Sequence, residues 1–290
     1  MGEIIGAGLV AHAPTIMMPR AERLALNEGK EISLVPGLER LRREVLDRLR
    51  PDTIIVFDTH WFTTVEFCVS AHAERRGLFT SDELPRGMSQ IPYHLKGNPA
   101  LGQAIAEEST LTGVRTTAIT DPYLPIHYPT INIHHYLGGG EEWLSVSCCQ
   151  TAETADFLKV GTGVARAIAR SNRRVVLLAS GSMSHRFWSL SELPKHESSD
   201  PIHISRPDAR MADQRRLQWF AEGNHAAIIE SMPEFLQFAP EARFGHYLMM
   251  VSALGGRACR ARGTRFSDYE NATGTSQVHV WFERPAAGWA

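Results

Sequence analysis

Three histidines each follow a short apolar run, and this repeated placement is the feature of the chain that points most directly to chemistry. The histidines are His12, His60 and His185, and the runs before them cover residues 4–11, 53–59 and 174–179. Short runs rich in β-branched residues predict buried strands. Because ligands of open α/β sheets bind outside the carboxyl ends of the strands, we expect the three imidazoles to converge on one site.

These histidines have a second interpretation, because an isolated histidine at a strand end is often a core residue whose nitrogens are satisfied by the backbone. Three histidines in equivalent places favour metal binding or catalysis instead. An unperturbed imidazole has a pKa of about 6.5, which suits proton transfer. His185 is therefore predicted to be either a third metal ligand or a general acid and base.

A carboxylate would complete a metal site with the first two histidines. Two histidines and one carboxylate bind a ferrous ion on one face and leave positions open on the other. The candidate is Glu241, which lies in the segment 238–243, predicted to turn between two helices. A single glutamate in such a turn is otherwise usually a solvated surface residue. The sequence therefore suggests His12, His60 and Glu241 as metal ligands.

The elements that must position these residues alternate between strand and helix, which predicts an α/β protein. We expect one domain over residues 1–290, with a mixed central β-sheet, helices on both faces and a flexible tail at 285–290. Predicted strands cover residues 4–11, 53–60, 65–70, 114–119, 143–148, 175–179 and 276–282. Predicted helices cover residues 38–50, 99–110, 154–170, 207–222, 225–232 and 244–254. The polar stretch 186–208 is long for a connection and is predicted to be a lid.

Composition excludes several classes of function. The net charge is −2 and the pI is near 6.7, so neither nucleic acid nor an anionic membrane is expected as a partner. No apolar run approaches the roughly 18 residues of a membrane span, and the first residues lack a secretory signal pattern. Adjacent Cys148 and Cys149 suit neither a disulfide framework nor a zinc site. We therefore expect a cytoplasmic protein with reduced, buried cysteines.

Motifs of other enzyme classes are missing. The chain has neither the His-Glu-x-x-His motif of metalloproteases nor a phosphate-binding P-loop. A Gly-x-Ser-x-Gly elbow is excluded because His185 stands where the last glycine of residues 181–185 would be. The sequence Gly161-Thr162-Gly163 is similar to part of a dinucleotide-binding loop, but no strand precedes it and the third glycine is absent. It is predicted to lie within a helix.

Longer blocks of sequence resemble those of class III extradiol ring-cleaving dioxygenases, the family of the protocatechuate 4,5-dioxygenase catalytic subunit. Within this family the chain is most similar to the 3,4-dihydroxyphenylacetate (homoprotocatechuate) 2,3-dioxygenases. The blocks are Asp52–Trp61, Thr80–Pro85, Gly97–Gln103, Leu178–Phe187 and Gly274–Val278, together with the segment around His12. The resemblance therefore extends over nearly the whole chain.

The resemblance implies an Fe(II) cofactor held by His12, His60 and Glu241, with His185 as the catalytic acid and base. A catecholic diol would chelate the iron, O2 would bind to the same iron, and the ring would open beside the two hydroxyls. The reaction expected is 2,3-cleavage of 3,4-dihydroxyphenylacetate to 5-carboxymethyl-2-hydroxymuconate semialdehyde. The expected partners are thus this aromatic diol and O2, and the expected assembly is a homo-oligomer.

The chain departs from the wider family at one active-site position. Many members have a second histidine in an Asp-His-Gly motif, whereas here the stretch reads Ile126-His127-Tyr128-Pro129-Thr130. Tyr128 falls at that position and is predicted to be catalytic, and His127 is one residue out of register. Either side chain could contact the substrate.

The polar group that a substrate carries on its ring needs a charged partner. His127, Arg186 and His246 are predicted to bind substrate, and His203 and Arg243 remain further candidates for this charged contact.

Other functions remain open on the sequence alone. A sister extradiol enzyme would act on protocatechuate, an aminophenol or a hydroxypyridine. A relative of the fold could instead be a non-enzymatic metal-binding or interaction protein, and a zinc hydrolase would work without O2. The presence together of His12, His60, Glu241 and His185 argues against the non-enzymatic alternative.

Overall fold

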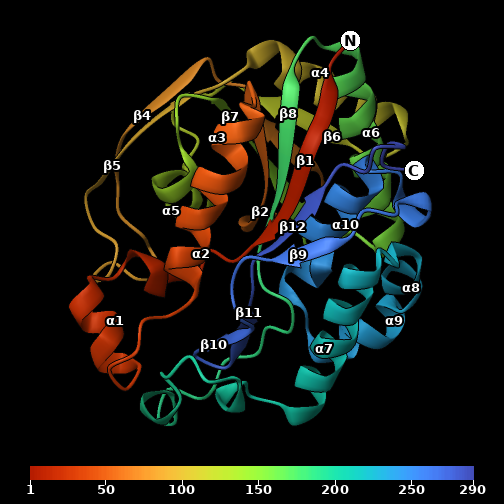
Figure 1. Ribbon diagram of the computed structural model, residues 1–290. Coiled ribbons are helices and arrows are strands. Elements are labelled where there is room, and N and C mark those ends of the chain that lie inside the picture. Colours follow the sequence, from red (N-terminus) through yellow and green to blue (C-terminus); the bar gives the residue numbers. More distant parts are fainter.

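A mixed β-sheet of ten strands forms the centre of the structure, a computed structural model that describes residues 1–290 (Figure 1). The strands are β1 (Glu3–Val10), β2 (Thr53–Thr63), β3 (Phe67–Ser70), β4 (Glu74–Phe79), β5 (Ile91–Lys96), β6 (Thr116–Ile119), β7 (Glu142–Cys149), β8 (Arg174–Ser180), β9 (Gly263–Arg265), β10 (Glu270–Ala272), β11 (Thr275–Gln277) and β12 (Val280–Glu283). Of these twelve strands, β10 and β11 form a separate small hairpin, and the other ten form the central sheet.

Ten α-helices accompany the sheet. They are α1 (Arg20–Leu26), α2 (Leu34–Leu41), α3 (Asp47–Leu49), α4 (Pro99–Leu111), α5 (Tyr128–Leu137), α6 (Thr154–Arg170), α7 (Pro207–Glu222), α8 (His225–Glu230), α9 (Met232–Phe235) and α10 (Gly245–Ala253). Short 3-10 turns cover Pro14–Met17, Leu193–Lys195, Pro201–His203, Leu236–Phe238, Glu241–Phe244 and Gly256–Ala258, and a π-helical segment covers Arg42–Leu46.

The order of strands across the sheet is β4-β5-β7-β2-β8-β1-β12-β9, and β3 pairs with both β6 and β7. The four central strands β7, β2, β8 and β1 run parallel, whereas β12 and β9 are antiparallel to their neighbours. The predicted mixed sheet is confirmed. Parallel central strands direct all their carboxyl ends to one edge, which is where a site is expected.

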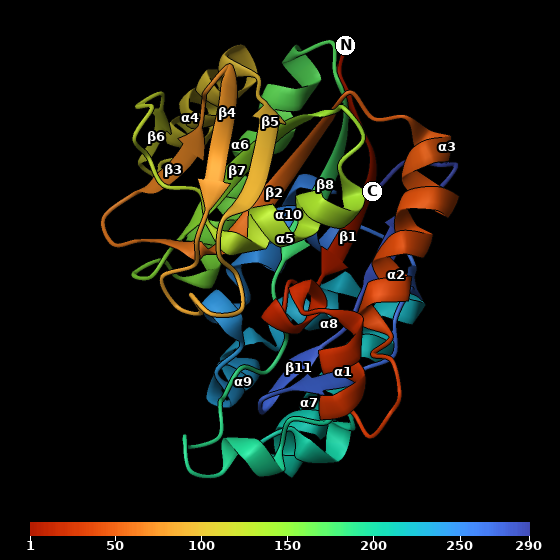
Figure 2. The same cartoon turned by 90° about the vertical axis from the view of Figure 1, so that its left-hand side faces the viewer.

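Side chains of the central strands alternate between two apolar layers. Along β8, Val175, Leu177 and Ala179 face one buried cluster, and Val176 and Leu178 face the other. Helices α4, α6 and α10 supply the first cluster, and α2 and α5 supply the second, so the sheet is covered on both faces (Figures 1 and 2). Strands buried on both faces are near-continuously apolar, which explains the short apolar runs in the sequence.

Helices α6 and α10 approach each other closely because glycine lies at their contacts. A Cβ atom on Gly161 would come within 2.2 Å of the carbonyl oxygen of Met249. A Cβ atom on Gly245 would come equally close to the ring of Phe157, at 2.2 Å. Gly161 lies inside α6, as predicted. This packing fixes the start of α10, which directly follows the turn that carries Glu241.

The predicted strand over residues 276–282 is wrong as a single element, because the chain leaves the ladder between β11 and β12. His279 causes the break. Its ring accepts a hydrogen bond from the backbone N–H of Ala11 at 3.1 Å and lies 3.1 Å from the carbonyl oxygen of Leu34. The backbone N–H of His279 donates to Ser267 Oγ at 2.7 Å. Complete burial lowers the pKa of His279 to about 4, so the ring is a neutral link between distant segments.

The observed elements differ from the predicted ones at two further places. The hairpin of β4 and β5 was not predicted, because its residues are mostly exposed or half-buried and β4 shows no apolar alternation. The predicted helix over 38–50 begins earlier, at Leu34, and passes through the π-helical segment before α3 ends. Helix α7 has the predicted bounds, and its end is set by Gly223 at φ 71°.

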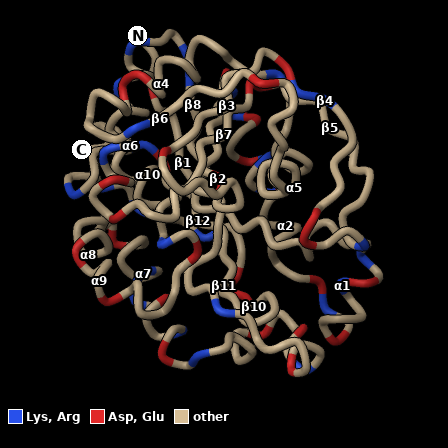
Figure 3. The backbone as a smooth tube through the Cα atoms, turned by 180° about the vertical axis from the view of Figure 1, so that it is seen from behind, with Lys and Arg blue, Asp and Glu red and all other residues tan.

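Three further observations concern the predicted lid, the cysteines and the charged residues. The stretch 186–208 contains two 3-10 turns before α7 begins at Pro207. Asn271 Nδ2 donates to the carbonyl oxygens of His196 and Ser198, which ties the stretch to the β10–β11 hairpin. Its role as a lid stays a prediction. All four cysteines are buried and unpaired, as expected. Acidic and basic residues are interspersed around the molecule (Figure 3). None of the helices combines the length and apolar character needed to cross a membrane.

Candidate metal centre and active site

Three neighbouring parallel strands reach the same level at one edge of the sheet, and this level defines the site. Val10 at the end of β1 lies opposite Ser180 at the end of β8, and Ser180 lies opposite Asp58 of β2. His12 comes two residues after Val10, and His60 comes two residues after Asp58. The prediction that the two histidines lie at one edge of the sheet is confirmed by this register.

An irregularity in β2 places His60. The pairing of β2 with β7 shifts between Asp58 and Phe62. The buried carboxylate of Asp58 accepts hydrogen bonds from the backbone N–H groups of His60 (3.0 Å) and Trp61 (3.2 Å), and from Thr130 Oγ1 (2.7 Å). A carboxylate that receives three donors satisfies the backbone groups that the bulge removes from the ladder. Asp58 therefore holds the bulge that presents His60.

Glu241 lies on a strained turn that is tied to the end of β8. Ala242, Arg243 and Phe244 have φ values of 46°, 57° and 61°, in the left-handed region that non-glycine residues rarely adopt. The N–H of Glu241 donates to the carbonyl oxygen of Met183 at 3.1 Å, and Pro240 and Ser184 form an isolated antiparallel bridge. Such conformations cost on the order of 1–3 kcal/mol each and persist only where the surroundings hold them.

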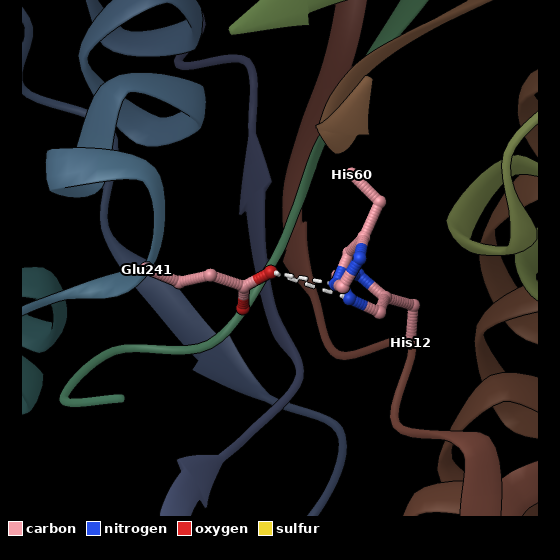
Figure 4. A group of neighbouring side chains, drawn as sticks. All are labelled: His12, His60 and Glu241. Atoms are coloured by element: carbon pink, nitrogen blue, oxygen red, sulfur yellow. Dashed lines mark ion pairs between the residues drawn. The ribbon is translucent and has the colours of Figure 1, made fainter. Parts of the chain in front are cut away.

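These elements bring His12, His60 and Glu241 together, with their ligand atoms within 4.8 Å of one another (Figure 4). Glu241 Oε1 lies 3.4 Å from His12 Nε2 and 3.5 Å from His60 Nε2. Two ligand atoms about 2.1 Å from one ion, at angles of about 90–110°, are roughly 3.0–3.5 Å apart. The spacing and the donor set of two imidazoles and one carboxylate therefore fit a divalent transition metal.

Other groups hold the Glu241 carboxylate in place. Thr59 Oγ1 donates to Oε1, and the backbone N–H of Ser182 donates to Oε2 at 2.6 Å. Burial acts to raise the pKa of Glu241, but the neighbouring imidazoles, His12 foremost, hold it well below its usual range. Glu241 is therefore an ionised carboxylate in a buried place.

His185 lies beside this group rather than within it. Its Nδ1 is 2.7 Å from Ser182 Oγ and 3.6 Å from Glu241 Oε2, and its Nε2 makes no hydrogen bond to the protein. Burial lowers the pKa of His185 below its ordinary value, although the negative charge of Glu241 opposes the shift. A neutral imidazole held through one nitrogen, with the other nitrogen free, can accept a proton and return it.

Tyr128 lies against His60, where it begins α5. Its hydroxyl is 2.7 Å from His60 Nε2, and the two ring centroids are 4.2 Å apart. Burial, followed by the negative charge of Glu241, raises the pKa of Tyr128 above its ordinary value. The phenol therefore stays protonated and is a hydrogen-bond donor at the rim of the site.

The other residues with predicted roles in substrate binding lie in different environments. His127 is half-buried and stacks on Trp61, with ring centroids 6.0 Å apart. Arg186 is exposed. His246 is fully buried, and neither ring nitrogen has a partner. A Cβ atom on Gly181 would lie 2.7 Å from His246 Nε2, so this ring fills the space behind the turn. The structure does not support direct contact between His246 and a substrate.

Asp213 is a buried residue that the sequence did not single out. One carboxylate oxygen accepts from the N–H of Ser184 at 3.2 Å, and the other accepts from Ser184 Oγ and the Tyr269 hydroxyl, both at 2.6 Å. Burial raises the pKa of Asp213 to about 6. Asp213 therefore anchors the turn that carries His185, and only its position on the apolar face of α7 could have indicated this.

An exposed arginine lies next to Glu241. Arg243 forms no ion pair, and it lines a small cavity of about 90 Å³ together with Phe62, Cys148, Cys149, Gln150 and Ala242. The ring of Phe62 is 6.2 Å from that of His60. A cation and an aromatic side chain thus border this cavity, and the aromatic one, Phe62, also lies beside His60.

Known proteins with similar sequences match nearly the whole chain. The family described as the catalytic LigB subunit of aromatic ring-opening dioxygenase matches residues 6–282. The chain is 30% identical over 262 residues to the 3,4-dihydroxyphenylacetate 2,3-dioxygenase of Escherichia coli, covering 88% of this chain and 91% of that enzyme. It is 26% identical over 274 residues to the 2-aminophenol 1,6-dioxygenase beta subunit of a Pseudomonas species, covering 87% and 86%.

A solved structure with the same fold is that of the uncharacterized protein JW3007 from Escherichia coli K12. The TM-score is 0.62 at 18% identity, and the alignment covers 96% of this chain and 99% of that one. This likeness supports the α/β fold. The sequence matches above confirm the resemblance inferred from the motifs.

The raised pKa of Asp213 predicts how stability depends on pH. Its native pKa of about 6 exceeds the ordinary 3.8, so the native state retains a proton that the unfolded chain loses between these values. The stabilising contribution is present below about pH 4 and is lost as the pH rises through 6, by about 3 kcal/mol. Urea unfolding at pH 4.5 and 7 should show the free-energy difference between wild type and Asp213→Asn shifting in favour of the variant at pH 7. An unchanged difference would contradict the assignment.

Proposed function

The chain belongs to the LigB family of catalytic subunits of aromatic ring-opening dioxygenases, and we propose that it uses Fe(II) held by His12, His60 and Glu241. Its class, an extradiol ring-cleaving dioxygenase, follows from this membership and sets aside the non-enzymatic and hydrolytic alternatives. The single observation that carries the proposal is the convergence of two imidazole nitrogens on Glu241 Oε1, at 3.4 and 3.5 Å.

Fe(II) is favoured by the donor set, because two histidines and one carboxylate leave neighbouring coordination positions open. When bound, the iron would supply these positions, at which a catecholic diol and O2 meet and exchange electrons. The side chains around it supply orientation and proton transfer. Ser180 Oγ lies 2.9 Å from His12 Nδ1 and steadies that ring.

His185 is proposed to be the acid and base of the reaction. Nε2 of its neutral ring accepts a proton from one hydroxyl of the diol, while Ser182 Oγ holds Nδ1 at 2.7 Å. The same nitrogen returns the proton to an oxygen of the product as the ring opens. Tyr128 remains protonated and donates a hydrogen bond to a substrate oxygen beside His60.

The proposed substrate is 3,4-dihydroxyphenylacetate, with 2,3-cleavage to 5-carboxymethyl-2-hydroxymuconate semialdehyde. Two observations support this choice. A relative with 30% identity acts on this compound by name, and the exposed Arg243 offers a cation for a substrate carboxylate. An aminophenol is the second candidate, because a 26% identical relative is named for 2-aminophenol. This compound carries no carboxylate and so needs no cation to bind one.

Substitution of the proposed ligand and the proposed acid and base should separate their roles. We expect His12→Ala to lose both iron and activity, because it removes an imidazole ligand. His185→Phe should keep its iron and lose turnover by about 10²–10⁴-fold, the usual contribution of a positioned acid or base. Iron content and oxygen uptake of the purified variants measure both effects. Loss of iron from His185→Phe would make His185 a ligand and break the assignment.

The role of Arg243 is tested by comparing a charged and an uncharged substrate. Arg243→Gln should lower kcat/KM for 3,4-dihydroxyphenylacetate by about 10-fold, since a hydrogen bond between charged groups contributes roughly 1.5–3 kcal/mol and less where solvent screens it. The effect on 4-methylcatechol should be small. Arg115→Gln, at an exposed arginine that precedes β6 and forms no ion pair, is the matched control. Equal effects of Arg243→Gln on both substrates would show that another group binds the carboxylate.

A further inference from the structure

We propose that Glu83 is a positioning residue for the metal centre: it holds the His60 ring so that Nε2 is presented to the ion. Glu83 lies in the loop between β4 and β5, 23 residues after His60 in the chain. Its Oε1 is 2.7 Å from His60 Nδ1, while His60 Nε2 is the nitrogen that faces Glu241. This inference rests on the metal centre of the proposed function.

The chemistry of the imidazole gives the contact its meaning. Only one nitrogen of a neutral imidazole carries a hydrogen, and the partner of one nitrogen decides the state of the other. An ionised carboxylate is an acceptor only, so Glu83 requires the hydrogen to be on Nδ1. Nε2 then carries the lone pair, on the side of Glu241 and of the Tyr128 hydroxyl. Carboxylate partners of this kind orient metal-binding histidines and increase their basicity.

His12 provides an internal comparison. Its Nδ1 lies 2.9 Å from Ser180 Oγ, a hydroxyl that can either donate or accept. Such a partner steadies the ring without setting the position of its hydrogen. His60 is therefore the proposed imidazole ligand whose outer nitrogen has a charged partner. It is also the less buried of the two, with a side chain 14% exposed against 5% for His12.

The loop is built to bring Glu83 to this place. Ser81 N–H donates to the carbonyl oxygen of Met88 at 2.9 Å, and Leu84 N–H donates to Ser81 Oγ at 3.1 Å. Met88 is buried, which anchors the loop to the apolar layer that contains α2 and α5. The carboxylate of Glu83 makes no hydrogen bond other than the one to His60. Its position is thus not explained by a second interaction elsewhere.

The loop that carries Glu83 connects the outer edge of the sheet with the proposed metal centre. Strands β4 and β5 form the outer hairpin of the sheet, and their loop reaches past α5 toward the carboxyl ends of the central strands (Figure 2). The half-exposed Glu83 lies at the rim, with a side chain 50% exposed. Solvent therefore weakens the contact, and the expected effect lies toward the lower end of the 10–100-fold range typical of such partners.

The chain offers a matched control on the same hairpin. Glu74 Oε1 lies 2.7 Å from His94 Nε2, in a pair that is exposed and takes no part in the site. Variants Glu83→Ala, Glu83→Gln and Glu74→Ala would be titrated with Fe(II) alone, under argon and against a competing chelator. We expect the dissociation constant to rise about 10-fold in Glu83→Ala and less in Glu83→Gln, whose amide oxygen still accepts from Nδ1–H. Glu74→Ala should bind as wild type does.

Two further readouts separate positioning from a general loss of structure. The visible absorption bands of the Co(II)-substituted protein should change in Glu83→Ala and not in Glu74→Ala, and the melting temperatures of the metal-free variants should agree. Tight wild-type binding with an unchanged dissociation constant in Glu83→Ala would overturn the inference alone. A wild-type protein that binds no Fe(II) would overturn the metal centre, and this inference with it.

Discussion

The site depends on how the buried, ionised carboxylate of Glu241 is stabilised by its neighbours. A carboxylate that leaves water loses several kcal/mol of solvation unless opposite charges and donors replace it. Thr59 and the N–H of Ser182 supply the donors, and the imidazoles of His12 and His60 supply nitrogens on the other side. These partners come from the carboxyl-terminal parts of three central strands. The parallel register of the sheet therefore brings together the groups that replace the lost water around the carboxylate. An ion between these atoms would meet the same electrostatic demand.

The turn that holds Glu241 is unfavourable on its own and is fixed by its neighbours. Three consecutive residues after Glu241 are in the left-handed region, and the backbone before it is bridged to Ser184. Asp213 holds Ser184 from the other side, and the close contact of α6 with α10 fixes the chain after the turn. His185, the proposed acid and base, lies between these anchors. One unit thus places both the carboxylate and the proposed proton-transfer group.

The sequence was sufficient for the parts of the site that depend on local pattern. His12, His60 and His185 could be found because neighbouring parallel strands bring together the residues near and just beyond their carboxyl ends. Glu83 and Asp213 could not, because both act across distances that tertiary packing alone determines. His246 was expected to reach substrate, but the sequence does not show which side of α10 faces the interior. The break at His279 depends in the same way on partners more than 200 residues away.

The most direct test of the account is oxygen uptake by the protein after anaerobic Fe(II) reconstitution, with 3,4-dihydroxyphenylacetate as substrate. We predict uptake of one O2 per substrate and a yellow ring-fission product, both absent in His12→Ala. Uptake with 2-aminophenol in place of the diol would keep the chemistry and correct the substrate. Iron-loaded protein that consumes no oxygen with any catechol or aminophenol would contradict the proposed Fe(II) chemistry of His12, His60 and Glu241.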